Sequence, residues 1–119
     1  MFTELHYMYR DASNYKEGKY VYFEGAATQE QRTAIGQKLE SGLYFIPADI
    51  ELEELQPRMT SFPSEDDHVW HEFVDLTLVE ALPCDAIVVG PIDQLAQAFD
   101  RISGPTGWDV EGAVIRLGV

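Results

Sequence analysis

The sequence predicts a single α+β domain over residues 1–119, built from a mainly antiparallel sheet with two or three helices. The length of 119 residues is that of one domain. With 45% hydrophobic residues, the chain can bury one core. In some segments apolar and polar residues alternate with period two, and in others the apolar residues have helical spacing. These segments follow in the order strand, strand, helix, three strands, helix. This grouping indicates an α+β domain.

The first two strands are predicted as a hairpin. Residues 3–10 alternate, which is typical of a half-buried strand. One face carries Leu5, Tyr7 and Tyr9, and the other carries Glu4, His6 and Arg10. Residues 19–24 form a second, aromatic-rich strand, and residues 11–18 form a long polar loop between the two.

The first helix is predicted to begin after Thr28, because Thr28 and Gln31 fit a capping box. Ile35 and Leu39 lie one turn apart on its buried face, and we expect Gly42 to end it in a left-handed conformation. The apolar residues 43–46 then predict a short buried strand.

Residues 49–67 are acidic and contain two prolines, so we expect a long surface connection with one helical turn near residues 51–55. A connection of this length in a small domain is often functional or mobile. The longest strand is predicted at residues 69–80. Its expected common face carries Trp70, Glu72, Val74, Leu76 and Leu78.

The last third of the chain predicts a short strand at residues 86–89 and a second helix that begins after residues 90–91. The apolar positions of this helix follow helical spacing: Ile92, Leu95, Ala96, Phe99 and Ile102. The tail has two interpretations. Asp109 can cap a third helix that Gly118 ends, or residues 113–117 can form an edge strand. We favour the helix.

Charge limits the classes of partner. The chain has 21 acidic and 8 basic residues, which gives a net charge of −13. Such a chain lacks the basic surface that nucleic acid or anionic lipid requires. Residues 59–100 contain nine acids and neither lysine nor arginine. We therefore expect a non-enzymatic module whose acidic face docks on a basic protein partner, in the extreme as a nucleic-acid mimic. The alternative is a surface that only keeps the protein in solution. The candidate partner-binding residues are Glu53, Glu54, Glu65, Asp66 and Asp75.

Residues 65–72 place two of the three histidines among four carboxylates. Imidazole and carboxylate groups both bind zinc, manganese or iron, so a divalent metal is one interpretation, although we predict no cofactor. The candidate ligands are Asp67, His68, His71 and Glu72. On a strand, His68 and His71 would point to opposite faces, and the helical zincin signature is absent. The other interpretations are a turn stabilised by carboxylate caps, or a site for acid–base catalysis.

Residues 9–16 combine charged, hydroxyl, amide and phenol groups at a strand end, where binding residues are common. The candidate ligand-binding residues are Arg10, Asp11, Asn14 and Lys16, together with Trp70. The alternative is a turn in which Asp11 or Asn14 bonds its own backbone and Arg10 pairs with Asp11. If the first interpretation holds, this loop and the two histidines belong to a small enzyme or a ligand-binding protein.

One cysteine, Cys84, excludes an internal disulfide, and no apolar run suits a signal peptide or a membrane helix. These features favour a cytoplasmic protein that does not contact a membrane. The oligomeric state stays open, because exposed aromatic residues would favour association while the net charge opposes it.

Three blocks, YRDASNYK at residues 9–16, SGLYFIP at 41–47 and DDHVWHE at 66–72, resemble those of a group of small bacterial proteins of uncharacterised function. The resemblance covers about a fifth of the chain and implies no activity or cofactor. It implies that the two polar blocks belong to one site, where the strand-end loop meets the histidine segment at one edge of the sheet.

Overall fold

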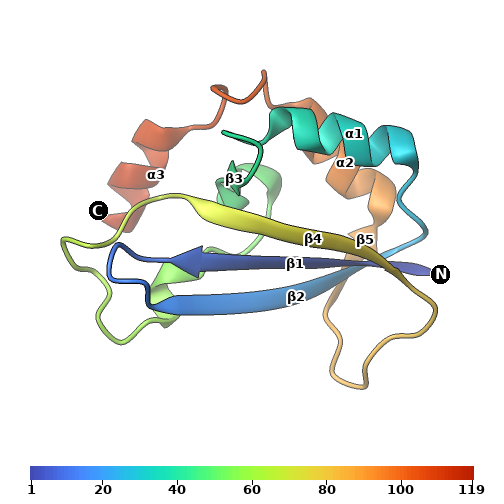
Figure 1. Ribbon diagram of the computed structural model, residues 1–119, viewed down its shortest axis with the longest axis horizontal. Helices are drawn as coiled ribbons and strands as arrows, with labels where there is room; N and C mark the ends of the chain where they lie inside the picture. The colour runs from blue at the N-terminus through green and yellow to red at the C-terminus, as the bar shows by residue number, and fades with distance from the viewer.

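The computed structural model describes residues 1–119, and its centre is a five-stranded sheet with the strand order β3-β4-β1-β2-β5 (Figure 1). Strand β1 (Phe2–Arg10) lies in the middle and pairs antiparallel with β2 (Lys16–Glu24) and β4 (His71–Val79). The two-residue β3 (Tyr44–Phe45) extends β4, whereas β5 (Val88–Pro91) pairs parallel with β2. The predicted α+β class with a mainly antiparallel sheet is confirmed.

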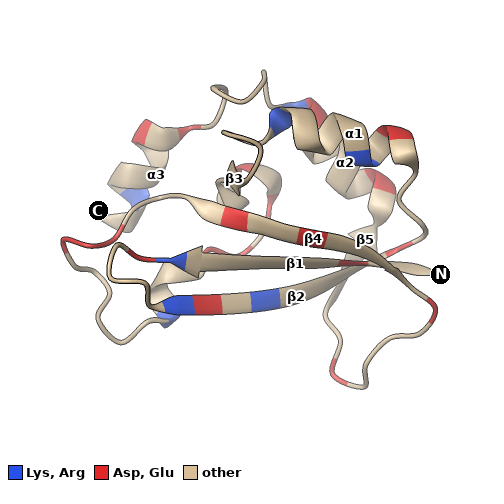
Figure 2. Ribbon diagram, viewed as in Figure 1, with Lys and Arg blue, Asp and Glu red and all other residues tan.

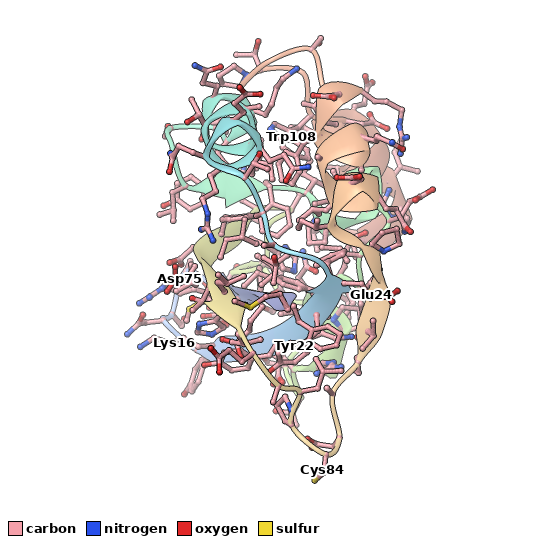
Figure 3. The ribbon with its side chains drawn as sticks, turned by 90° about the vertical axis from the view of Figure 1, so that its right-hand side faces the viewer. Lys16, Tyr22, Glu24, Asp75, Cys84 and Trp108 are labelled. Carbon is pink, nitrogen blue, oxygen red and sulfur yellow. The ribbon has the colours of Figure 1, made fainter.

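All three helices lie on one side of the sheet (Figure 1), and the view in Figure 3 shows α1 and α2 above the strands. They are α1 (Gln29–Lys38), α2 (Ile92–Asp100) and α3 (Val110–Leu117). The favoured interpretation of the tail as a helix is confirmed, and Asp109 caps it by accepting from the Gly112 N–H. The structure has no helix that is long and apolar enough to cross a membrane.

The core lies between the sheet and the helices. The alternation predicted for β1 is confirmed, because Leu5, Tyr7 and Tyr9 are fully buried. Aromatic rings continue this core towards the helices, with Phe99 and Trp108 packed edge to face at 5.8 Å between ring centroids. Each such ring contributes roughly 1.5–3 kcal/mol through burial alone.

Several predicted boundaries were wrong because distant pairing decides where a strand starts. Strand β2 begins at Lys16 instead of residue 19, since its first residues continue the ladder with β1 and shorten the loop. Strand β5 begins at Val88 rather than residue 86. Helix α1 ends at Lys38, followed by an extended Leu39. Gly42 does adopt a left-handed φ of +73°, but in the turn after the helix rather than at its end.

A bulge in β4 overturns the predicted common face of that strand. Phe73 pairs with Tyr7 and Asp75 pairs with His6, so Val74 is an extra residue between them. An extra residue reverses the alternation of side chains on either side of it. The earlier residues Trp70 and Glu72 therefore do not share a face with Leu76 and Leu78, as the sequence had predicted.

The connection between β3 and β4 is more than a surface loop. No helical turn forms at residues 51–55; short 3-10 helices flank that stretch, η1 (Pro47–Ile50) and η2 (Gln56–Arg58). Leu55 is fully buried, and its backbone N–H donates to Nε2 of His71 at 3.0 Å. The Tyr7 hydroxyl donates to the carbonyl of Glu53 at 2.8 Å. These bonds tie the connection to the core side of the sheet.

Candidate functional site

The two polar blocks meet at one end of the sheet. The Ala12 N–H donates to the carbonyl of Asp66 at 3.1 Å, and the Ser13 hydroxyl donates to the Asp66 carboxylate at 2.6 Å. Residues 10–16 and 66–72 therefore lie side by side, as the resemblance implies.

Local hydrogen bonds shape the loop after β1. The Asp11 carboxylate is buried and accepts from the backbone N–H groups of Ser13 and Tyr15, both at 2.9 Å. Asn14 adopts a left-handed φ of +68°, which asparagine tolerates better than most residues. Arg10 does not pair with Asp11, contrary to one predicted alternative. Its guanidinium bonds the Asn14 side chain at 2.6 Å and, on β4, Glu72 at 3.0 Å.

His68 connects the end of β1 to the segment that precedes β4. Its Nε2 lies 2.7 Å from the carbonyl oxygen of Arg10, and its Nδ1 lies 3.1 Å from the backbone nitrogen of Trp70. A carbonyl only accepts and a backbone N–H only donates. The two bonds therefore require a neutral ring with its proton on Nε2.

The Tyr9 hydroxyl supports this segment from the core side. It donates to the Asp67 carboxylate at 2.6 Å and accepts from the backbone N–H of His68 at 3.2 Å. Burial, followed by the hydrogen bond to Asp67, raises the pKa of Tyr9 well above its usual range. The phenol therefore stays protonated and holds the segment in place.

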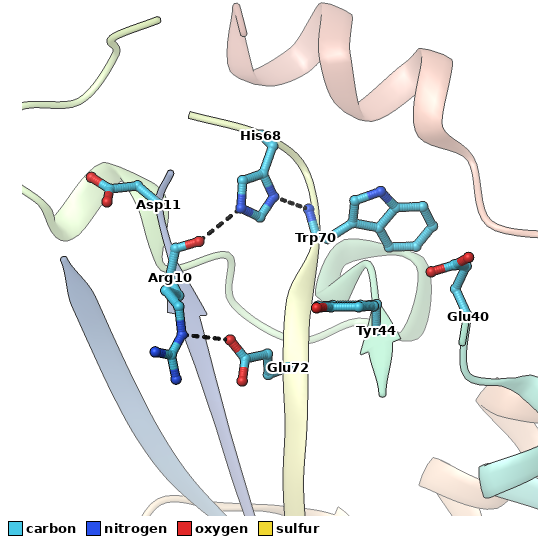
Figure 4. A pocket seen from close by; sticks show the side chains of 7 residues that line it. All are labelled: Arg10, Asp11, Glu40, Tyr44, His68, Trp70 and Glu72. Atoms are coloured by element: carbon cyan, nitrogen blue, oxygen red, sulfur yellow. Dashed lines mark hydrogen bonds and ion pairs between the residues drawn. The ribbon is translucent and has the colours of Figure 1, made fainter. Parts of the chain in front are cut away.

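These contacts surround a pocket of about 370 Å³ at the sheet edge (Figure 4). Seven residues from β1, β3, β4 and the segments next to them line it: Arg10, Asp11, Glu40, Tyr44, His68, Trp70 and Glu72. The rings of Tyr44 and Trp70 lie 6.5 Å apart between centroids, at an angle of 58°. We call this set of seven residues the edge pocket. With three carboxylates and one guanidinium, the pocket lining has a formal charge of −2 when His68 is neutral.

Both acids beside the aromatic rings keep free acceptor capacity. In Figure 4 the Glu40 carboxylate lies beside Tyr44 and Trp70, and its one side-chain partner is the Ser41 hydroxyl at 2.9 Å. Glu72 uses one oxygen, Oε2, for Arg10. A cation that enters the edge pocket can therefore contact carboxylate oxygens without breaking the internal ion pair.

His71 does not take part in this pocket. It is fully buried, with its ring 5.3 Å from that of Tyr9 and 6.2 Å from those of Tyr7 and Phe45, measured between centroids. Burial lowers its pKa to about 3, an effect that the Val69 backbone only partly offsets.

The four candidate metal ligands do not converge. His71 points into the core as the first residue of β4, while His68 lies before the strand and bonds backbone groups. Asp67 accepts from Tyr9, and Glu72 pairs with Arg10. The structure has no group of three or more His, Cys, Asp or Glu side chains that could hold a metal ion.

The candidate partner-binding acids do not form one continuous surface. Glu53 pairs with Lys19 and Arg58, whose hydrogen bonds hold its pKa below the usual range. Glu54 bonds Arg116 at 2.9 Å. The remaining three are Asp66, which accepts from Ser13, Asp75 on β4 and the exposed Glu65. Figure 2 shows acidic residues on all three helices, on β4 and on the loops. Residues 59–100, which contain neither lysine nor arginine, therefore do not form one acidic face.

Five of the seven lining residues were predicted as site residues from the sequence, and Glu40 and Tyr44 were not. Tyr44 belongs to the SGLYFIP block, which was the available signal, whereas nothing in the local sequence marks Glu40. Lys16 lies outside the edge pocket and lines a different hollow of about 450 Å³ with Tyr15 and Arg58.

No family model matches the chain, and neither the curated proteins nor the solved structures contain a match to it. The chemistry of the edge pocket is therefore the basis for a functional proposal.

Proposed function

We propose that the protein is a non-enzymatic interaction module that binds a positively charged side chain of a basic partner in the edge pocket. The observation that carries this proposal is the pair of rings, Tyr44 and Trp70, beside the carboxylates of Glu40 and Glu72. A cation over an aromatic face is stabilised by about 0.5–2 kcal/mol, more as the site loses water.

Electrostatics favours a cation over an anion at this place. The edge pocket contains three carboxylates against the single guanidinium of Arg10, and the net charge of −13 attracts cations from a distance. An anionic ligand would have to approach Asp11, Glu40 and Glu72 with Arg10 already paired. The edge pocket thus has, in one place, the negative charge that the sequence suggested for a larger surface.

The bonds of His68 support a binding role rather than an enzymatic one. A general base has to lie within hydrogen-bond reach of the substrate proton that it removes. Both ring nitrogens of His68 bind backbone groups, at 2.7 and 3.1 Å. His71 is buried in the core and has no access to a substrate.

The test is an NMR titration of the ¹⁵N-labelled protein with an end-blocked peptide that contains lysine and arginine. The indole signal of Trp70 should shift in a saturable way, while that of the buried Trp108 stays in place. The control peptide carries glutamate at the basic positions and should leave both signals unchanged.

Single substitutions test whether the peptide binds in the edge pocket. Glu40→Gln and Trp70→Ala should each weaken it, whereas Glu80→Gln, an exposed acid at the opposite end of β4, should not. Equal effects of Glu40→Gln and Glu80→Gln would show that the peptide only follows the net charge. A dissociation constant weaker than about 10 mM would also refute the proposal, since binding free energy would then be only about −3 kcal/mol.

A further inference from the structure

Trp70 packs partly against the core, and the one hydrogen bond that fixes its backbone comes from His68. It precedes β4, whose pairing with β3 begins at His71, so no ladder bond fixes its backbone. The partner of its backbone N–H is Nδ1 of His68, and the indole nitrogen has no hydrogen-bond partner. His68 is in turn anchored to the end of β1 through the carbonyl of Arg10.

A proton on Nδ1 would remove this support. Protonated histidine donates from both nitrogens, so the His68 ring would then present an N–H to the N–H of Trp70. Two donors at 3.1 Å cannot form a hydrogen bond, and the backbone of Trp70 would have to move. The same proton changes the formal charge of the pocket lining from −2 to −1, which weakens the attraction for a cation.

Charged and titratable groups face His68 from every segment around it. From β1 and the loop after it come Tyr9, Arg10 and Asp11; Asp67 is adjacent in the chain, and His71 and Glu72 lie at the start of β4. Among these groups, the carboxylates of Asp11, Asp67 and Glu72 carry negative charge and the Arg10 guanidinium carries positive charge.

We propose that His68 is a positioning residue that holds Trp70 in the edge pocket, and that protonation of His68 releases Trp70 and lowers the affinity for cations. The binding half of this inference rests on the proposed function. The inference that His68 positions Trp70 concerns the protein without peptide, and it rests only on the hydrogen bonds of His68 to the Arg10 carbonyl and the Trp70 N–H.

The experiment repeats the NMR titration with the basic peptide at pH 8.0 and pH 5.5, and follows the backbone and indole signals of Trp70 in the free protein over the same range. In the wild type, the dissociation constant should increase by about threefold to tenfold at the lower pH, the equivalent of one hydrogen bond. The free Trp70 signals should move together with the ring signals of His68.

The decisive variant is His68→Asn, which keeps an oxygen acceptor near the position of Nδ1 but cannot take up a proton. It should bind the peptide with an affinity that changes little between the two pH values. His68→Gln serves if the asparagine variant does not fold. The matched control is His6→Asn, because His6 stacks on Tyr20 outside the edge pocket and should leave the wild-type pH dependence intact.

The outcomes separate the two proposals. If the peptide binds but the pH dependence is the same in His68→Asn as in the wild type, the role of His68 is refuted and the binding function stands. If no peptide binds at either pH while the Trp70 signals of the free protein still follow His68, the binding function and its regulation are refuted together and the positional role stands. Trp70 signals that ignore the titration of His68 refute the positional role.

Discussion

Lowering the pH from 7 to 5 should destabilise the folded protein through His71. This residue is fully buried, and burial lowers its pKa from 6.5 to about 3. Between these two values the unfolded chain binds a proton at His71 that the folded protein does not. Stability is therefore retained above pH 6.5 and is lost as the pH falls towards 3.

The magnitude follows from the pKa difference. Each unit is worth about 1.4 kcal/mol, and pH 5 lies 1.5 units below 6.5, the pKa of an unperturbed histidine. The free energy of unfolding should thus fall by about 2 kcal/mol between pH 7 and pH 5 through this residue. That is a large part of the roughly 5–15 kcal/mol of a typical domain.

The assay is urea unfolding at pH 7 and pH 5, followed by tryptophan fluorescence, for the wild type and His71→Gln. Glutamine can still accept from the Leu55 N–H but does not titrate. The variant should lose about 2 kcal/mol less than the wild type over this interval, whatever its stability at pH 7. Carboxylates contribute equally to both proteins and cancel in the comparison. Equal losses in the two proteins, or a reduced loss in the control His6→Gln, would refute the reasoning.

Three further predictions concern other contacts. Arg10→Gln removes the pocket's own cation from Glu72 and should tighten peptide binding about threefold, measured by the same NMR titration, with weaker binding as the contrary result. Thr28→Ala removes the hydroxyl that accepts from the Gln31 N–H at 3.1 Å and should cost about 1 kcal/mol in urea unfolding, whereas an unchanged midpoint would contradict the cap. Arg32→Ala uncovers the carbonyl of Leu76 at the free edge of β4 and should increase self-association in sedimentation experiments, while a variant that sediments like the wild type would show that the edge is protected otherwise.

Features of the fold that depend on near neighbours in sequence were predictable. The capping box of Thr28 and Gln31 spans four residues and forms as expected. The alternation of β1 needs only that one face of the strand is buried, and Leu5, Tyr7 and Tyr9 are on that face. The cap of α3 is similarly local to Asp109 and Gly112.

Features that depend on pairing between distant segments were not predictable. The bulge at Val74 exists because two residues of β4 oppose one residue of β1, and the sequence of residues 69–80 alone does not indicate it. Leu55 is buried because Tyr7 and His71, from two strands, bond the connection that carries it. Its segment has no regular periodicity from which burial could be inferred.

The same distinction explains what was found of the candidate site. The polar character of residues 10–11 and 68–72 is visible in the sequence, but Glu40 and Tyr44 join them only because β3 pairs with the start of β4. This pairing also separates the two histidines. It fixes His71 as an inward residue of the strand and leaves His68, three residues earlier, outside the sheet. The spacing of His68 and His71 suggested that they share a metal. In the fold, His71 instead belongs to the core and His68 positions Trp70. Their opposite environments predict opposite consequences of a proton: at His71 it destabilises the whole fold, whereas at His68 it alters one wall of the edge pocket.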